Sequence, residues 1–131
     1  MEAAYPFATY SWDIVALFVS ILLEANRPAE ALTIAQEAIS RLETLGVGGV
    51  GEIHLRLAHA EALHAAGKPE AARGALLVTL DKLRLRMNNI PDASARERYV
   101  TNVPPHARLF ALAKEWLGDI DVRERIGLTS A

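Results

Sequence analysis

Three of the four histidines, His54, His59 and His64, follow one another at intervals of five residues. Imidazole is a common metal ligand, so a metal site is the first chemistry to consider. On a helix a step of five residues turns by about 140°, so neighbouring rings point in different directions. Glu61 and His64 are three residues apart and could share a ligand, but nothing further completes a zinc site. We expect no bound metal.

Residues 46–51 read Gly-Val-Gly-Gly-Val-Gly, which satisfies the G-x-G-x-x-G pattern of dinucleotide-binding loops. Such a loop needs a strand before it, whereas here a helical pattern precedes it. Glu52 would also repel a phosphate at the start of the next helix. The chain has no Cys, and Ser20 and Ser40 lie within helical patterns, without the sharp turn of a nucleophilic serine. We expect a flexible linker, no cofactor and no enzymatic activity.

The composition is typical of a helical globular protein. Of the 131 residues 51% are hydrophobic, and only 6% are aromatic. The net charge of −2 argues against nucleic acid as a partner. It divides into −5 over residues 1–65 (three Arg, eight Asp or Glu) and +3 over residues 66–131 (eleven Lys or Arg, eight Asp or Glu). The lack of Cys suits the cytoplasm, and no apolar run reaches the roughly 20 residues that span a bilayer.

Apolar periodicity predicts an all-α fold of about six helices. They cover about residues 12–25, 28–45, 52–66 and 69–88, a short segment from Asp92 or Ser94, and 106–117. We interpret residues 1–131 as one domain: an extended arm (1–10), repeat one (11–46), repeat two (52–88), two capping helices (92–118) and a tail (119–131). Val103-Pro104-Pro105 predicts a rigid turn. Gly74 disfavours its helix by about 1 kcal/mol relative to Ala, which close contact with another helix would explain.

Two stretches repeat each other 41 residues apart, 22–32 and 63–73. The shared residues are Leu22/Leu63, Ala25/Ala66, Pro28/Pro69 and Ala31/Ala72. Each copy reads as helix, tight turn, helix. A fixed period in this range is typical of a helical-hairpin repeat array. Such arrays bind other proteins more often than they catalyse reactions.

Pro28-Ala29-Glu30-Ala31 and Pro69-Glu70-Ala71-Ala72 resemble the turns of tetratricopeptide repeats. The 41-residue spacing is similar to the longer variant of that repeat, with extended second helices. Asn26 stands where the family has Gly, and neither copy has the usual aromatic residue near its start. The resemblance covers about residues 12–88 and implies paired helices that form a concave groove for a protein or peptide.

Residues 98–118 resemble the C-terminal cap of tetratricopeptide regions in large bacterial regulatory proteins. The resemblance rests on Arg98 to Arg108, read as Arg-Tyr-Val-Thr-Asn-Val-Pro-Pro-His-Ala-Arg, and on Leu112 to Gly118. Those regions often follow a kinase or ATPase module, which is not found in this sequence. The resemblance implies a stand-alone bacterial adaptor or the end of a longer chain.

In this family the first helix of each hairpin lines the groove. The corresponding positions here are Asp13, Ala16, Leu17, Ser20, Leu23 and Glu24 in the first copy, and His54, Leu57, Ala58, Glu61, His64 and Ala65 in the second. The groove is thus expected to be acidic with apolar floor positions. It would suit a peptide that bears Lys or Arg and one or two apolar anchors.

The first predicted helix is apolar nearly all round, so either the N-terminal arm or another molecule must cover its outer face. We expect a homodimer through this helix and the aromatic arm. The residues concerned are Tyr10, Trp12, Ile14, Leu17, Phe18 and Ile21. Self-assembly is therefore the alternative to an adaptor function. A basic cluster is formed by Lys82, Arg84, Arg86, Arg96 and Arg98. It either complements a helix C-terminus or docks an acidic peptide or the acidic half of a neighbouring chain.

Overall fold

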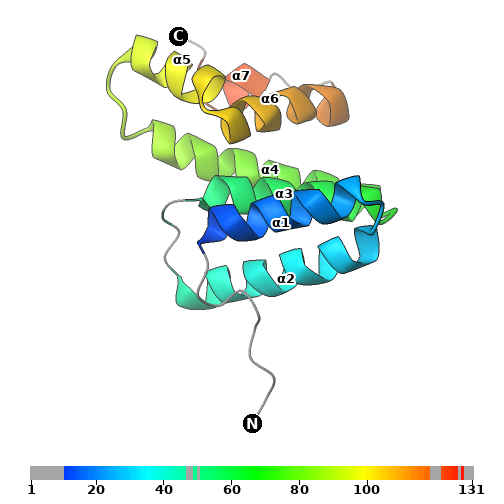
Figure 1. The fold of residues 1–131 in the computed structure, drawn as a ribbon. Coiled ribbons are helices and arrows are strands. Elements are labelled where there is room, and N and C mark those ends of the chain that lie inside the picture. The colour runs from blue at the N-terminus through cyan, green and yellow to red at the C-terminus, as the bar shows by residue number, and fades with distance from the viewer. Residues whose placement is uncertain (1–10, 47–48, 50, 119–121, 127, 129–131) are drawn as a thin grey trace. The chain divides into compact units, whose positions relative to one another are not determined.

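The computed structural model describes residues 11–46, 49, 51–118, 122–126 and 128. The all-α prediction is confirmed: these residues form helices joined by turns, with no strand among them (Figure 1). The helices are α1 (Trp12–Glu24), α2 (Pro28–Leu45), α3 (Glu52–Ala65), α4 (Pro69–Met87), α5 (Ala93–Asn102), α6 (Pro104–Leu117) and α7 (Val122–Arg125). None of these helices combines the length and the apolar character that crossing a bilayer requires. The chain forms two compact units, 1–72 and 73–131, and the division falls within α4. The single-domain assignment stays a prediction.

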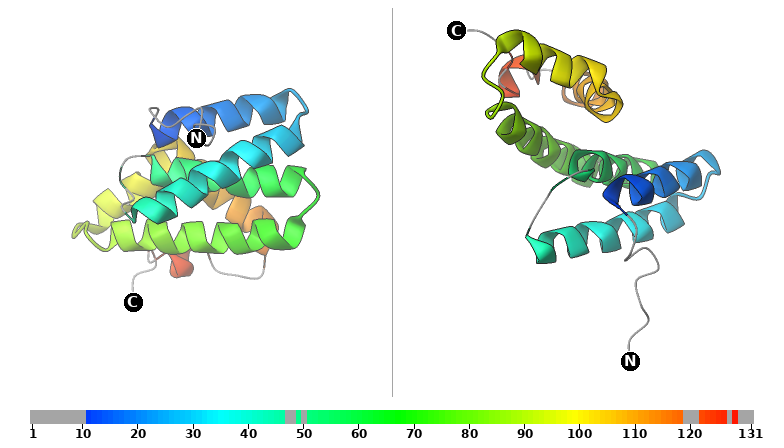
Figure 2. Two further views of the ribbon diagram at one scale, coloured as in Figure 1. Left: turned by 90° about the horizontal axis from the view of Figure 1, so that it is seen from below. Right: turned by 60° about the vertical axis from the view of Figure 1, so that its left-hand side comes forward.

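In the first unit α1, α2 and α3 each pack against the other two. Successive helices run in opposite directions, as Figure 2 shows from two sides. The core of this packing consists of small and branched side chains, with Val15, Val19, Ala35 and Ala38 fully buried. Alanine at the contact positions lets helix axes approach closely, which accounts for the high alanine content of this half.

The turns that close the two hairpins are built alike. In the first, the Asn26 and Arg27 N–H groups donate to the carbonyls of Leu23 and Leu22, at 3.0 and 2.9 Å. In the second, residues 67 and 68 donate to 64 and 63 in the same pattern, at 3.1 and 3.0 Å. This is a Schellman turn, which needs a left-handed residue after the helix. Asn26, at φ +61°, replaces the usual glycine because asparagine tolerates that conformation.

Local signals set the helix ends in the first unit. The Ser11 hydroxyl accepts from the Ile14 N–H at 3.3 Å and caps α1. Pro28 occupies the first turn of α2, and left-handed Gly46 ends it. Gly51, at φ +87°, begins α3 and lies directly against the start of α1. A Cβ atom on Gly51 would be 2.8 Å from the Asp13 backbone nitrogen, so this position requires glycine.

The second unit is organised around a sharp corner between α5 and α6. A single residue, Val103, ends α5 and begins α6. The His106 ring lies on Tyr99, with centroids 4.4 Å apart, and its Nδ1–H donates to the Tyr99 carbonyl at 2.8 Å. Asp92 caps α5 by accepting from the Ala95 N–H at 2.8 Å. The corner brings Tyr99 and His106, which are seven residues apart in the sequence, into direct contact.

Two expectations about this unit are wrong. The helix predicted from His106 begins at Pro104, so Pro104 and Pro105 form its first turn and do not form a separate rigid turn. Proline fits there because the first helical N–H groups have no partner within the helix. Gly74 is not explained by a close contact with the described residues, since beyond its own helix backbone none of them has an atom within 4 Å of a Cβ built on it.

Candidate functional site

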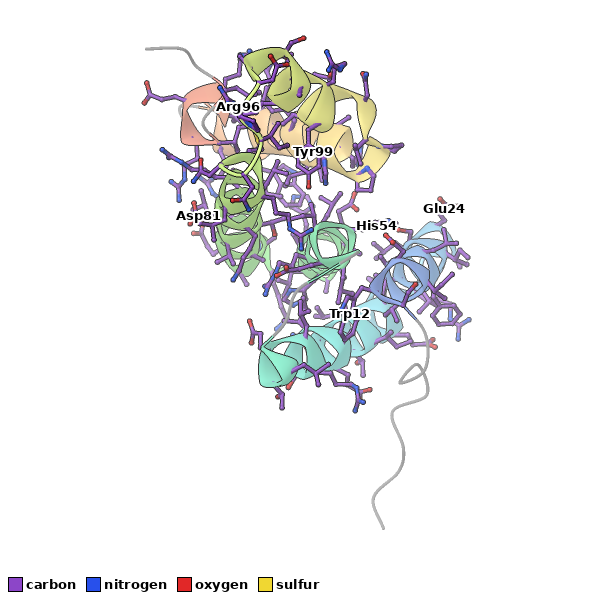
Figure 3. All side chains as sticks on the ribbon, turned by 90° about the vertical axis from the view of Figure 1, so that its left-hand side faces the viewer. Trp12, Glu24, His54, Asp81, Arg96 and Tyr99 are labelled. Carbon is purple, nitrogen blue, oxygen red and sulfur yellow. The ribbon has the colours of Figure 1, made fainter. Side chains whose placement is uncertain are left out.

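Asp13 and His54 form the contact around which the predicted groove is built. Asp13 Oδ1 on α1 lies 2.9 Å from His54 Nδ1 on α3. A carboxylate only accepts hydrogen bonds, so the ring nitrogen is the donor. Both side chains keep contact with solvent, at 45% exposure for Asp13 and 28% for His54. Figure 3 shows His54 on α3 next to α1, with Trp12 and Glu24 marking the two ends of α1.

The structure brings together part of the predicted groove set on one face of α1 and α3. Ser20 and Glu24 lie on the same side of α1 as Asp13, because residues at 13, 20 and 24 fall within about 40° on a helix. Glu61 is half-buried on α3, in line with His54, and His64 and Ala65 are exposed at its end. We call Asp13, Ser20, Glu24, His54 and Glu61 the acidic face. Its three carboxylates favour a cationic ligand.

Other members of the predicted set are placed below this surface. Leu57 and Ala58 are 2% and 1% exposed, and Ala16 is fully buried. They belong to the core of the first unit and are not available to a partner, which corrects the prediction for these three. Leu23 is half-buried. The family pattern predicts which helix position a residue occupies, but it does not predict how far neighbouring side chains bury that residue.

A second surface feature is an apolar stripe on the outer side of α1. Ile14, Leu17 and Ile21 are 47%, 53% and 52% exposed, and they fall within about 60° of one another around the helix. We call these three residues the α1 stripe. Three exposed aliphatic side chains in one row are unusual for surface positions that contact only water.

The remaining residues predicted for self-association differ in exposure. Trp12 and Phe18 are half-buried, so the helix is not exposed all round. Tyr10 lies outside the described residues. The predicted outer apolar face is therefore narrower than the sequence suggested and is reduced to the α1 stripe. Leu17 belongs to the stripe and lies next to the acidic face, so the two features are continuous on the surface of α1.

Sequence reasoning missed a buried charge cluster between α2 and α3. Glu52 and Arg56 are 6% and 8% exposed, and their side chains are 2.8 Å apart. Glu43 of α2 approaches Arg56 at 3.8 Å. Burial, with the Arg56 charge nearby, lowers the pKa of His59, which is half-buried beside this cluster. Only the i, i+4 spacing of Glu52 and Arg56 could have indicated the pair.

The predicted basic cluster is largely engaged within the second unit. Arg96 donates to the carbonyls of Ile90 and Pro91, at 2.6 and 3.1 Å, and Arg98 donates to the Ser94 hydroxyl at 2.7 Å. Figure 3 marks Arg96 and Tyr99 on α5 and Asp81 on α4.

The short helix α7 is held to the rest of this unit by charged contacts. Arg123 pairs with Glu97 of α5 at 2.7 Å, and Arg125 pairs with Asp81 of α4 at 3.2 Å. The hydrogen bond from Arg123 lowers the pKa of the Glu97 carboxyl. Three arginines, Arg84, Arg123 and Arg125, therefore join α7 to α4 and α5.

The described residues offer little for catalysis or metal binding. Within them no three His, Asp or Glu side chains converge to hold a metal ion. An open hollow of about 360 Å³ lies on the outer side of α2, lined by Ala29, Glu30, Thr33 and Ile34. Its carboxylate, Glu30, pairs with Arg27 at 2.6 Å, so the hollow presents no available charge. Of the glycine-rich run, residues 47, 48 and 50 lie outside the described part.

The chain was compared with protein-family models, curated proteins and solved structures. No family model, no curated protein and no solved structure matched this chain.

Proposed function

We propose that this protein is a non-catalytic protein–protein interaction module that binds an amphipathic, positively charged segment along α1. The observation that carries the proposal is that the α1 stripe lies beside the acidic face, three of whose five residues are on the same helix. Helix α1 itself holds two acidic residues, Asp13 and Glu24, and no basic one.

The chemistry of this surface defines the partner. An exposed row of Ile14, Leu17 and Ile21 gains by burial, at roughly 25 cal/mol per Å² of apolar area removed from water. A helix of a partner that presents apolar residues at intervals of three and four would fit this row. Lys or Arg beside those residues would meet Asp13 and Glu24. The repeat resemblance supports the same class of function, since tetratricopeptide arrays bind peptides.

The proposal includes a cytoplasmic location in a bacterium, in keeping with the absence of Cys and with the resemblance to bacterial regulatory proteins. The adaptor function and the self-assembly function share the α1 surface. They differ in whether the bound segment belongs to another protein or to a second copy.

A designed peptide tests the adaptor function directly. The probe is a synthetic amphipathic helix of about 18 residues, long enough to be partly helical alone, with Leu at every third or fourth position and Lys along one flank. Fluorescence anisotropy should show binding in the micromolar range, typical of a small interface. Replacing Lys by Glu in the peptide should weaken binding, and so should raising the salt concentration.

Matched protein variants locate the binding surface. Leu17→Glu should abolish binding, because it places a charge in the centre of the apolar row. Gln36→Glu, at an exposed position of α2, is the control and should bind as the wild type does. The proposal is wrong if the Lys peptide binds no better than its Glu counterpart, or if Leu17→Glu binds it equally well while circular dichroism shows an intact fold.

A further inference from the structure

Helix α4 carries an exposed row of its own, in the part that belongs to the second unit. Gly74, Val78, Asp81 and Leu85 fall within about 60° of one another around the helix, and we call them the α4 stripe. Val78 and Leu85 are 45% and 61% exposed. Gly74 is exposed, and no atom of the described residues outside its own helix backbone lies within 4 Å of a Cβ position built on it.

Gly74 is the feature that needs an explanation. Glycine disfavours the interior of a helix, and at this position an alanine would be accommodated without any contact. Its φ is not in the left-handed region, so the backbone does not require it. Nothing in the described chain explains the glycine, whereas the close approach of a helix from another molecule would. The absent side chain leaves a shallow depression in the row.

The charges beside the two stripes are complementary. Asp13 and Glu24 lie on one flank of the α1 stripe, 11 residues apart. Arg73 and Arg84 lie on one flank of the α4 stripe, also 11 residues apart. Both separations correspond to about 16 Å along a helix. Arg73 is exposed, and so is Arg84, which donates one hydrogen bond to the Arg125 carbonyl at 3.1 Å.

The positions of the charged pairs determine whether α1 and α4 pack parallel or antiparallel. Viewed from the N-terminus of each helix, the acidic pair and the basic pair lie on the same side of their stripes. Antiparallel packing brings these two sides together. Glu24 then lies opposite Arg73 while Asp13 lies opposite Arg84, and Ile21 lies next to Gly74.

We propose that the α1 stripe of one copy docks antiparallel on the α4 stripe of a second copy. The large side chains of α1 fill the row that Gly74 leaves open, and two acid–base pairs fix the register. Asp81 does not oppose this arrangement as an isolated charge, because it is paired with Arg125. The contact joins two different surfaces, so it is heterologous and self-association is not limited to pairs by local symmetry. This inference rests on the proposed function, because it names the occupant of the α1 surface.

Engineered cross-linking tests the contact, since the chain contains no Cys. Ile21→Cys and Gly74→Cys are made as separate proteins, mixed in equal amounts and oxidised. A mixed disulfide dimer, identified by mass spectrometry, should exceed the mixed product of Ile21→Cys with Gln36→Cys at least about tenfold. The inference is wrong if the mixed product does not exceed that control, or if Ile21→Cys links mainly to itself, which would mean that two α1 stripes face each other.

Two further measurements separate docking from folding. Gly74→Leu fills the depression with a good helix former, so it should weaken association at least about tenfold by light scattering while the chain remains folded. Glu24→Arg and Arg73→Glu should each weaken association by up to about fivefold, and their mixture should recover it. Unchanged association in Gly74→Leu, or no recovery in the charge-exchanged mixture, would overturn the inference.

The association and peptide-binding experiments together distinguish a wrong occupant of the α1 surface from a wrong proposed function. If copies do not associate but the Lys peptide binds the α1 surface, the interaction function stands and only the second-copy occupant is wrong. If the peptide also fails to bind, the α1 surface is not a docking site for a basic helix, and both proposals are wrong.

Discussion

Asp13 and His54 form a side-chain hydrogen bond of 2.9 Å, and they are 41 residues apart, the interval that also separates the two matching stretches of the sequence. If those stretches are successive repeats, α1 and α3 contact each other through residues at the same repeat position. The difference between the two residues matters for this contact, since two carboxylates at this distance would repel one another, whereas a carboxylate accepts a hydrogen bond from an imidazole N–H.

The contribution of this contact can be measured with a double-mutant cycle. Asp13→Ala and His54→Ala are compared with the double variant by urea denaturation at neutral pH. The cycle removes the separate effect of Asp13 on the N-terminus of α1. Because both side chains are partly exposed, the coupling free energy should be about 0.2–1 kcal/mol. Additive single effects would mean that the contact does not stabilise the α1–α3 packing.

The alanines shared by the two copies should tolerate no enlargement. Ala31 is fully buried in α2, whereas Ala29 on the same helix is exposed. Ala31→Leu should lower the free energy of unfolding by about 1–3 kcal/mol through overpacking. Ala29→Leu should change it by less than about 0.5 kcal/mol.

The same comparison applies one repeat later, with Ala72→Leu against Ala71→Leu. Thermal melting of the four variants gives the ranking. Unchanged melting in both buried-site variants would show that the alignment of the copies is misplaced.

Two glycines should respond in opposite directions to the same substitution. Gly74→Ala should raise the free energy of unfolding by about 0.5–1 kcal/mol, because the helix gains propensity and the added methyl group meets nothing. Gly67→Ala should lower it by about 1 kcal/mol, because φ is +81° there and the surroundings are also open. Chemical denaturation of both variants checks the pair. A stabilised Gly67→Ala would contradict the left-handed turn.

Stability should decline on mild acidification. Burial lowers the pKa of His106 and of His59 below the ordinary value of 6.5. The unfolded chain then binds protons that the folded chain does not, so stability is complete above about pH 6.5 and falls as the pH drops towards the folded-state pKa. Urea midpoints measured from pH 8 to pH 5 should show this fall.

His59→Gln is the matched test of that pH dependence, because it leaves the His106–Tyr99 corner intact. The variant should lose part of the decline between pH 6.5 and pH 5. An identical pH profile in the variant and the wild type would exclude a contribution from His59.

The sequence was informative wherever a structural feature is local. The helices predicted to begin near residues 12 and 28 do so, because Ser11 caps the first and Pro28 begins the second, and Gly46 and Gly118 end the helices that precede them. The proline pair Pro104 and Pro105 predicts a turn but begins α6, because proline has the same backbone preference in a turn and in the first turn of a helix.

Depth of burial was much less predictable. Leu57 and Ala58 were expected in the groove, yet both are covered. The charged pair Glu52 and Arg56 was not expected in the interior at all. α3 has apolar residues on several sides, so its sequence does not distinguish one covered face from another. Burial of such a helix depends on the neighbours that surround it.

Because α3 is apolar on several sides, the Glu52–Arg56 pair determines which of those sides faces α2. A helix that is apolar on all sides can rotate about its own axis with little change in buried area. The Glu52–Arg56 pair must lie next to Glu43, so it permits only one rotation of α3, even though buried ion pairs contribute little net stability. We expect Glu52→Leu combined with Arg56→Met to keep its helical content and melting temperature but to give broadened or duplicated amide resonances in NMR spectra. A single sharp set of peaks would mean that close packing of the small side chains is sufficient to fix the rotation of α3 about its axis.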